Sequence, residues 1–171
     1  HIVKSAHLPS YLKNANVDIK YICDSNASVE KELNLKEFEI PFSTYSDDVI
    51  NSNLIDIIVI CTPQKTHYEL CKQSLMAGKH VLCQKPFCGD LEAAKKLISL
   101  AEEKQLLLLV NETFRWYPVY KKVKEILEND EIGYPILTVF EDFGWSDYHP
   151  YEQFEKKFLL LRNSSHKLDL F

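Results

Sequence analysis

An amide, a cation and a proline directly follow an apolar run near the middle of the chain: Gln84, Lys85 and Pro86. The run itself, residues 81–83, has the composition of a short buried strand. A lysine held at a strand end can donate a hydrogen bond to a reacting oxygen, and partial desolvation suits it for acid–base chemistry. On these residues alone Lys85 is a catalytic candidate, and an exposed lysine at an ordinary strand end is the stronger alternative.

A second turn of the same kind lies upstream. Residues 57–61 form an unbroken apolar run, as expected of a parallel strand covered on both faces, and Thr62 and Pro63 follow it. Ligands of open parallel sheets bind beyond the carboxyl ends of the strands, so both turns are expected to face one ligand. Thr62 and Pro63 would contact it, or they simply end a strand. His67 either contacts that ligand or satisfies the start of a helix.

The residues between and after these turns predict helices that join the strands. Thr66 and Glu69 form a Ser/Thr-x-x-Glu capping box, and Gly78 stands where a helix usually ends. Asp90 is expected to cap a second helix. The apolar residues of that helix recur at the spacing of one buried face: Leu91, Ala94, Leu97, Ile98 and Ala101.

Strands alternate with helical patterns up to about residue 131, which favours an α/β fold with a doubly wound parallel sheet. The strands are predicted at residues 17–23, 55–61, 81–83 and 106–110. From residue 136 a strand is predicted with no helix between it and the next loop, so a boundary is predicted near Gly133. The first domain would span residues 1–133, and residues 134–171 would begin a second, truncated or gapped domain. We expect the chain to be part of a longer one.

Composition limits the class of protein. Of 171 residues, 46% are hydrophobic and 26% charged, which is typical of a globular protein. The net charge of −5 argues against a nucleic-acid partner, and no apolar stretch has the roughly 20 residues of a membrane span. No signal peptide is recognisable, so a cytoplasmic location is expected. The five cysteines show no metal-ligand spacing, which favours reduced thiols and no metal.

Taken in order, these segments resemble the glucose–fructose oxidoreductase and inositol dehydrogenase superfamily of NAD(P)-dependent oxidoreductases. The resemblance covers about residues 1–145. Its motifs are residues 56–63 with His67, Ala-Gly-Lys-His-Val at 77–81, Gln-Lys-Pro at 84–86, residues 111–118 with Arg115, and Ile132-Gly133. It implies a Rossmann-type domain, then a second α/β domain with a mostly antiparallel sheet that often packs against another subunit. A homo-oligomer is expected on this ground.

The resemblance also implies a cofactor site for NAD, with NADP as the alternative. Asp24 would accept hydrogen bonds from the adenosine ribose and thereby favour NAD, unless it merely makes a turn after a strand. The Gly-rich loop that cradles the pyrophosphate in this family is not in the sequence and is expected to precede His1. The implied cofactor-binding residues are Asp24, Thr62, Pro63, His67, Gln84, Lys85, Pro86 and Asn111.

For activity, the resemblance implies hydride transfer between the nicotinamide and a hydroxyl-bearing carbon of a sugar, cyclitol or similar small polar substrate. Lys85 would polarise the oxygen and His166 would take or give the proton. Arg115 and Trp116 would lie near the substrate. Three positions depart from the family pattern: Gln84 replaces a glutamate, Arg162 stands where an aspartate is expected, and Ser164 stands where a glycine is expected. The departures at Gln84 and Arg162 leave open a non-catalytic nucleotide-binding regulator or scaffold of the same fold.

Overall fold

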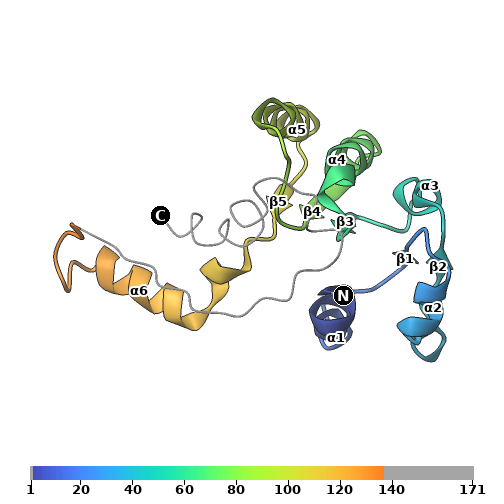
Figure 1. Cartoon of the computed structure of the whole chain (residues 1–171), viewed down its shortest axis with the longest axis horizontal. Coiled ribbons are helices and arrows are strands. Elements are labelled where there is room, and N and C mark those ends of the chain that lie inside the picture. Colours follow the sequence, from blue (N-terminus) through green and yellow to red (C-terminus); the bar gives the residue numbers. More distant parts are fainter. Residues whose placement is uncertain (1, 137–171) are drawn as a thin grey trace, which may run out of the picture. The chain divides into compact units, whose positions relative to one another are not determined.

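The computed structural model of the chain describes residues 2–136, which belong to two compact units that divide between Val110 and Asn111 (Figure 1). The boundary predicted near Gly133 lies within the second unit. The domain bounds 1–133 and 134–171 stay predictions, because residues 137–171 lie outside the described residues.

A three-stranded parallel sheet forms the larger half of the first unit. Its strands β3 (Ile57–Ile60), β4 (His80–Cys83) and β5 (Leu108–Val110) lie side by side in chain order. The helices α4 (His67–Met76) and α5 (Leu91–Lys104) connect them. Parallel strands joined through helices are the repeating unit of a Rossmann-type fold, so this part of the predicted fold class is confirmed.

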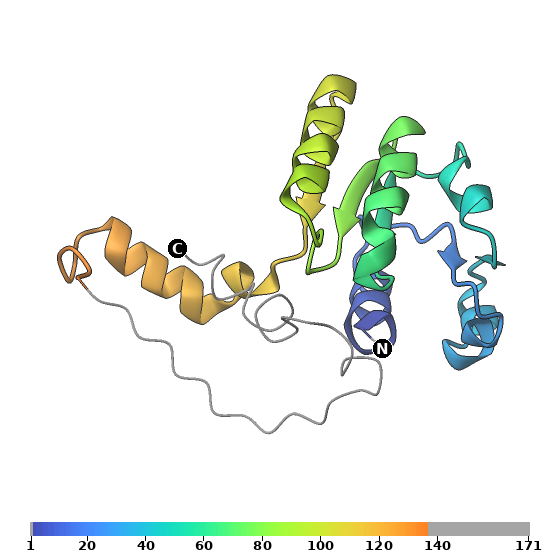
Figure 2. The same ribbon diagram turned by 45° about the horizontal axis from the view of Figure 1, so that its top comes forward.

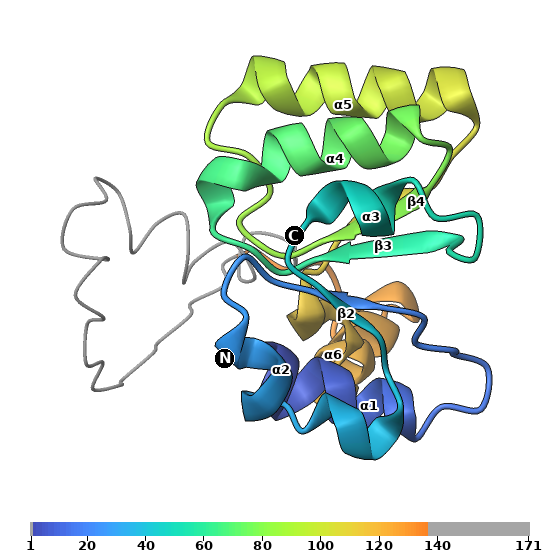
Figure 3. The ribbon, with the colours of Figure 1, turned by 90° about the vertical axis from the view of Figure 1, so that its right-hand side faces the viewer.

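The two connecting helices lie next to each other on one face of this sheet (Figures 2 and 3). Between them and the strands lies a core of fully buried small and medium side chains: Ile60, Cys71, Leu75, Val81, Cys83, Leu97 and Ala101. The opposite face is open within this unit, because Ile57 and Val59 are exposed. The apolar run of β3 is thus covered on one face of the described unit, whereas its sequence predicts cover on both.

The ends of α4 and α5 test the capping predictions. Gly78 follows α4 with a φ of +76°, a conformation that glycine adopts without strain, so the predicted helix end is confirmed. Asp90 caps α5 as predicted, because its carboxylate accepts a hydrogen bond from the Ala93 N–H at 2.9 Å. The capping box at Thr66 is wrong. Its side chain makes no cap bond, because a 3-10 turn, η3 (Gln64–Thr66), precedes α4.

The buried face of α5 is narrower than the sequence predicts. Leu97 and Ala101 are buried, but Leu91 and Ile98 are 68% and 48% exposed. Within the first unit α5 packs against α4 and against β4 and β5 from one side only. Apolar residues at the edges of its apolar face therefore stay at the surface.

A second, two-stranded sheet holds the earlier part of the first unit. Its strands β1 (Ile22–Cys23) and β2 (Phe42–Ser43) pair in parallel. The strand predicted over residues 17–23 is therefore wrong at 17–21, where no neighbouring strand of the described residues extends the ladder. The short helices of this half are η1 (Val3–His7), α1 (Leu8–Leu12), α2 (Ser28–Glu32), η2 (Leu35–Phe38) and α3 (Ser46–Ile50).

One hydrophobic cluster joins several of these short elements. Leu8 of α1 and Leu35 of η2 are buried together with Ile40, and Ile22 of β1 packs against them. Residues 28–38 form two short helices instead of one, because Asn34 takes a left-handed φ of 54° between α2 and η2. In the doubly wound order, two strands lie on one side of a central strand and three on the other. The pair β2–β1 and the trio β3–β4–β5 match these two groups.

The second unit contains, among its described residues, a 3-10 turn η4 (Thr113–Trp116) and the helix α6 (Pro118–Glu128). Pro118 is the first residue of α6, where the fixed φ of proline suits a helix. Apolar residues of α6 are not buried among the described residues, since Val119 and Val123 are 61% and 48% exposed. The strand predicted from residue 136 lies outside the described residues. None of the helices between residues 2 and 136 is long and apolar enough to cross a membrane.

Candidate functional site

The turn after β4 carries the catalytic candidate. The Gln84 N–H donates a hydrogen bond to the Ile60 carbonyl at 2.8 Å, which extends the pairing of β4 with β3 by one residue. The Gln84 side chain folds back, and its Oε1 accepts a bond from the Lys85 N–H at 3.3 Å. Lys85 is half-buried, and the Lys85–Pro86 peptide bond is cis. Since β4 ends at Cys83 and Gln84 adds one further backbone bond to β3, the chain leaves the sheet at Lys85.

The turn after β3 lies beside it. Thr62 and Pro63 are exposed, so their backbone is open to a ligand. The Thr66 hydroxyl lies 2.8 Å from the Pro63 carbonyl and 2.7 Å from the Thr62 hydroxyl. The Thr66 N–H also donates to the Pro63 carbonyl at 2.9 Å. These contacts close the turn on itself and leave its outer surface free of side-chain cover.

His67, the first residue of α4, lies beneath both turns and is only 1% exposed. Its Nε2 is 2.8 Å from the Thr62 carbonyl, and its Nδ1 is 3.0 Å from the Pro86 carbonyl and 3.1 Å from the Phe87 carbonyl. The sequence predicts that His67 either contacts the nucleotide or satisfies a helix start. The structure shows a third arrangement, in which the ring connects the two turns.

Asp24 follows β1 and is exposed. Its backbone N–H donates to the Ser43 carbonyl at 3.2 Å, which ties it to the end of β2. Its Oδ1 accepts a hydrogen bond from the Asn26 N–H at 2.9 Å, the geometry of an Asx turn. The carboxylate thus makes a turn and still faces solvent at the carboxyl end of a parallel strand.

Four cysteines are gathered near this edge and in the core behind it. Burial raises the pKa of the Cys61 and Cys88 thiols from 9 to about 11, and the nearby Cys71 thiol adds to the effect at Cys88. A hydrogen bond with Cys71, together with burial, raises the pKa of Cys83. The Cys61, Cys83 and Cys88 thiols are therefore protonated at neutral pH and are poor nucleophiles. Among residues 2–136, no group of three or more His, Cys, Asp or Glu residues is placed to hold a metal.

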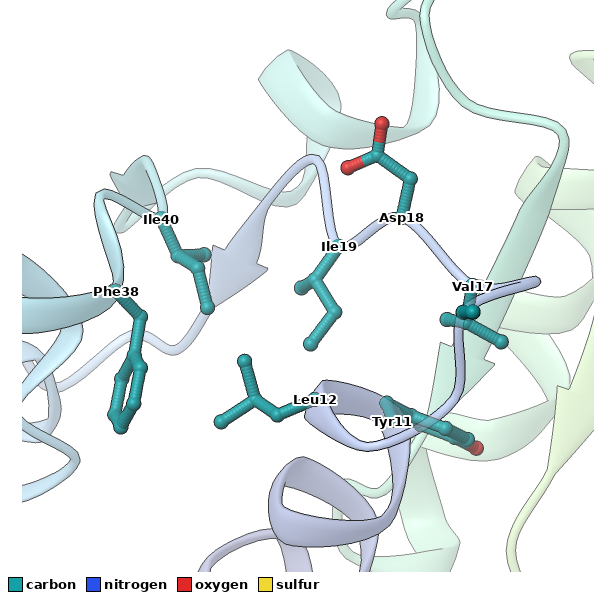
Figure 4. Close-up of a pocket in the computed structure, with 8 residues that line it drawn as sticks. Tyr11, Leu12, Val17, Asp18, Ile19, Phe38 and Ile40 are labelled. Atoms are coloured by element: carbon teal, nitrogen blue, oxygen red, sulfur yellow. The ribbon is translucent and has the colours of Figure 1, made fainter.

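A pocket of about 430 Å³ lies elsewhere in the first unit (Figure 4). Its lining comes from α1 and from the segments that precede β1 and β2: Tyr11, Leu12, Ala15, Val17, Asp18, Ile19, Phe38 and Ile40. It therefore opens at the amino side of these strands. Ligands of parallel sheets bind at the opposite, carboxyl edge, so this pocket is separate from the candidate site.

The structure brings six of the predicted residues together at the carboxyl edge of β3 and β4: Thr62, Pro63, His67, Gln84, Lys85 and Pro86. Asp24 lies at the corresponding edge of β1. Asn111, Arg115 and Trp116 belong to the second unit, where Asn111 directly follows the end of β5. Arg162, Ser164 and His166 lie outside the described residues.

Sequence reasoning missed the role of Lys79. This lysine is only 8% exposed, and its Nζ donates to the Ser52 carbonyl at 2.7 Å and to the Ile55 carbonyl at 2.8 Å. It clamps the segment before β3 at the amino edge of the sheet. The sequence signal for this burial is the position of Lys79 between Gly78, which ends α4, and the first residue of β4, because the chain enters the sheet there.

Comparisons with known proteins identify the class. Residues 2–112 match the model of the Gfo/Idh/MocA family, described as an oxidoreductase family with an NAD-binding Rossmann fold. The chain therefore belongs to this family of oxidoreductases. It is 40% identical over 112 residues to an uncharacterized oxidoreductase of Schizosaccharomyces pombe, an alignment that covers 61% of the chain and 30% of that protein.

Two further relatives are named for their reactions. An inositol 2-dehydrogenase/D-chiro-inositol 3-dehydrogenase of Lactiplantibacillus plantarum is 25% identical over 98% of the chain and 48% of its own length. A 3-ketoreductase from Actinomadura kijaniata, solved with NADP and TDP-benzene, superimposes with a TM-score of 0.70 at 26% identity, covering 77% of this chain and 40% of that one. The chain thus spans less than half the length of these relatives.

The described residues fit a nicotinamide dinucleotide. An exposed carboxylate follows β1, where it can meet the ribose hydroxyls, and an exposed turn follows β3, where backbone groups can approach the cofactor. Lys85 lies at the next strand end along the same sheet. The Thr62–Pro63 turn and Lys85 share the carboxyl edge of the three-stranded sheet, and Asp24 lies at the carboxyl end of β1 in the two-stranded sheet.

Proposed function

We propose that the protein is an NAD(P)-dependent oxidoreductase that transfers a hydride between the nicotinamide and a hydroxyl-bearing carbon of a sugar, cyclitol or similar small polar molecule. The observation that carries the proposal is the position of Lys85. It leaves the sheet one residue beyond the last β3–β4 backbone bond, next to the open Thr62–Pro63 turn. A cation there can reach the substrate oxygen.

Lys85 has a defined task in this proposal. When bound, the nicotinamide accepts or supplies the hydride. Lys85 donates a hydrogen bond to the substrate oxygen and stabilises the charge that develops on it. His166 then takes or gives the proton, as the resemblance implies. The names of two relatives, an inositol dehydrogenase and a 3-ketoreductase, support a carbinol or ketone carbon of a ring as the reacting centre.

Asp24 supports NAD over NADP as the preferred cofactor. Its exposed carboxylate could accept both ribose hydroxyls and would repel a 2′-phosphate. The Asx turn that it forms with Asn26 does not compete with this role, because it uses one of the two carboxylate oxygens.

The test combines binding and turnover in the complete protein. NADH and NADPH are titrated separately by quenching of tryptophan fluorescence, and a panel of sugars, polyols and cyclitols is screened by nicotinamide absorbance. For the substrate that turns over, Lys85→Met should lower kcat by about 10²–10⁴-fold, the usual range for a lost acid–base group. NADH affinity should fall by a smaller factor than kcat. Lys95→Met, an exposed lysine on α5, is the matched control and should leave both values unchanged.

The outcomes separate the two classes of function. Turnover that depends on Lys85 supports the enzyme. Micromolar NADH binding without turnover on the whole panel supports a non-catalytic regulator and contradicts the proposal. Asp24→Asn should reduce the preference for NADH over NADPH. Self-association, expected from the resemblance, is measured in the same preparation by light scattering, and a monomer at working concentration would contradict it.

A further inference from the structure

The His67 imidazole spans two turns that leave neighbouring strands. Its Nε2 meets the Thr62 carbonyl and its Nδ1 meets the Pro86 and Phe87 carbonyls, all within 3.1 Å. Thr62 lies two residues beyond the end of β3, and Pro86 directly follows Lys85. The ring therefore connects the exposed turn to the turn that carries the catalytic candidate.

Lys85 is held on both sides by bonds to other elements. On one side, the Gln84 N–H donates to the Ile60 carbonyl at 2.8 Å. On the other, the Pro86 carbonyl lies 3.0 Å from the His67 ring. The first bond anchors the lysine to β3 and the second anchors it to the start of α4. The backbone of Lys85 thus has little freedom to move away from the Thr62–Pro63 turn.

A second contact brings the same two turns together. A side chain at Gly89, in the loop after β4, would lie 3.7 Å from the Gln64 Nε2, so the Gln64 amide packs against this loop. That nitrogen is buried although Gln64 as a whole is only half-buried. The two turns therefore form one packed layer, with Thr62 and Pro63 on its outside and His67 beneath.

All three partners of the His67 ring are carbonyl oxygens, which only accept hydrogen bonds, so a ring nitrogen bonds to them only when it carries a proton. A neutral ring donates to one turn and packs against the other, and a doubly protonated ring donates to both. Burial at 1% leaves no ring atom open to a ligand that approaches from the outside of the turns.

We infer that His67 is a positioning residue, which fixes Lys85 against the Thr62–Pro63 turn and thereby sets the distance between the polarising lysine and the cofactor. This inference rests on the proposed function. In this inference His67 does not contact the nucleotide directly, and it affects the site through its contacts with Thr62 and Pro86. Displacing a catalytic group by about 1 Å can cost about 10²-fold in rate, so the effect on turnover should be large.

The test uses His67→Phe, which keeps a ring of similar size and removes both nitrogens, and His67→Gln, which keeps one amide donor. The matched control is Ser74→Ala, because Ser74 is also fully buried on α4 and donates within that helix to the Leu70 carbonyl at 2.7 Å. Hydrogen exchange of peptides covering residues 61–66 and 84–90 is measured in the complete protein, together with NADH affinity and kcat.

His67→Phe is expected to speed exchange about tenfold in both turns and to lower kcat about 10- to 100-fold, while NADH affinity changes less than about threefold. His67→Gln should recover part of both losses, and Ser74→Ala should move neither turn. Unchanged exchange in either turn overturns the inference. So does a loss of NADH affinity that equals or exceeds the loss in kcat, because that pattern indicates direct nucleotide contact.

The exchange measurement also separates the two proposals. If the wild-type protein shows no turnover on any substrate, the proposed function fails, but exchange in the two turns still decides whether His67 holds them together. If His67→Phe does not fold, the decision rests on His67→Gln, for which equal exchange in both turns relative to Ser74→Ala contradicts the inference.

Discussion

Lys79 provides a quantitative test of how the sheet is held at the edge opposite the candidate site. The perturbation is Lys79→Met, which keeps the length of the side chain and removes its ammonium group. The two carbonyls that it now satisfies, those of Ser52 and Ile55, would lose their donor, and Ile55 itself is buried. We expect a loss of stability without an effect on the cofactor edge.

The magnitude follows from two opposing terms. Two hydrogen bonds to a charged donor contribute about 1.5–3 kcal/mol each, so about 3–6 kcal/mol is lost. Removing a buried ammonium recovers part of this, since the effective cost of burying an ion in a protein is several kcal/mol. We therefore expect the free energy of unfolding to fall by about 2 kcal/mol, within the range of disruptive single substitutions.

Urea unfolding of the ligand-free protein measures this value. The midpoint should decrease while the m-value, which reports the surface exposed on unfolding, stays the same. Lys95→Met is the control, because its side chain is 60% exposed and pairs with Glu92 on the surface of α5. Such exposed pairs contribute less than about 1 kcal/mol. The reasoning is refuted if the two variants unfold at the same urea concentration, or if Lys79→Met weakens NADH binding.

Three further outcomes can be measured on the same preparation. Asp90→Ala should lower the free energy of unfolding by about 1 kcal/mol through the lost cap of α5, and Asp90→Ser, which restores a capping oxygen, should recover most of it. Gly78→Ala should cost about 1–2 kcal/mol, because its φ of +76° is unfavourable for alanine although the space is open; no loss would contradict the left-handed assignment. Burial raises the pKa of the Cys61 and Cys88 thiols from 9 to about 11, so their contribution to the stability of the fold is fully present below pH 9 and is lost as pH rises from 9 through 11. Below pH 9, alkylation of these thiols should be much slower in the folded than in the urea-unfolded protein, and equal rates would contradict the raised pKa values.

Much of the first unit could be predicted because its signals are local. The helix end at Gly78 and the cap at Asp90 each depend on one residue with a strong conformational or hydrogen-bonding preference. The strands β3 and β4 come from short apolar runs whose neighbours in the sheet are also their neighbours in the chain. Gln84, Lys85 and Pro86 could then be placed at a strand end, because the strand itself was recognisable.

Other features depend on contacts that no local pattern contains. The capping box at Thr66 failed because the backbone closes a 3-10 turn there and the hydroxyl finds the Pro63 carbonyl instead. The strand at 17–21 failed because extended backbone becomes a strand only where a neighbour supplies its hydrogen bonds. The connecting role of His67 requires the Thr62 and Pro86 carbonyls to meet on either side of one ring, and they are far apart in the sequence.

The pairing of β3, β4 and β5 in chain order has a kinetic consequence. Every backbone ladder of this sheet joins two segments separated by a single helix, so each closes a loop of moderate length, and the entropy lost on closure grows only slowly with that length. Folding rates rise when contacting residues are close in sequence. The β3–α4–β4–α5–β5 segment can therefore assemble as one cooperative unit, and it should hold the amides that exchange most slowly in the first unit.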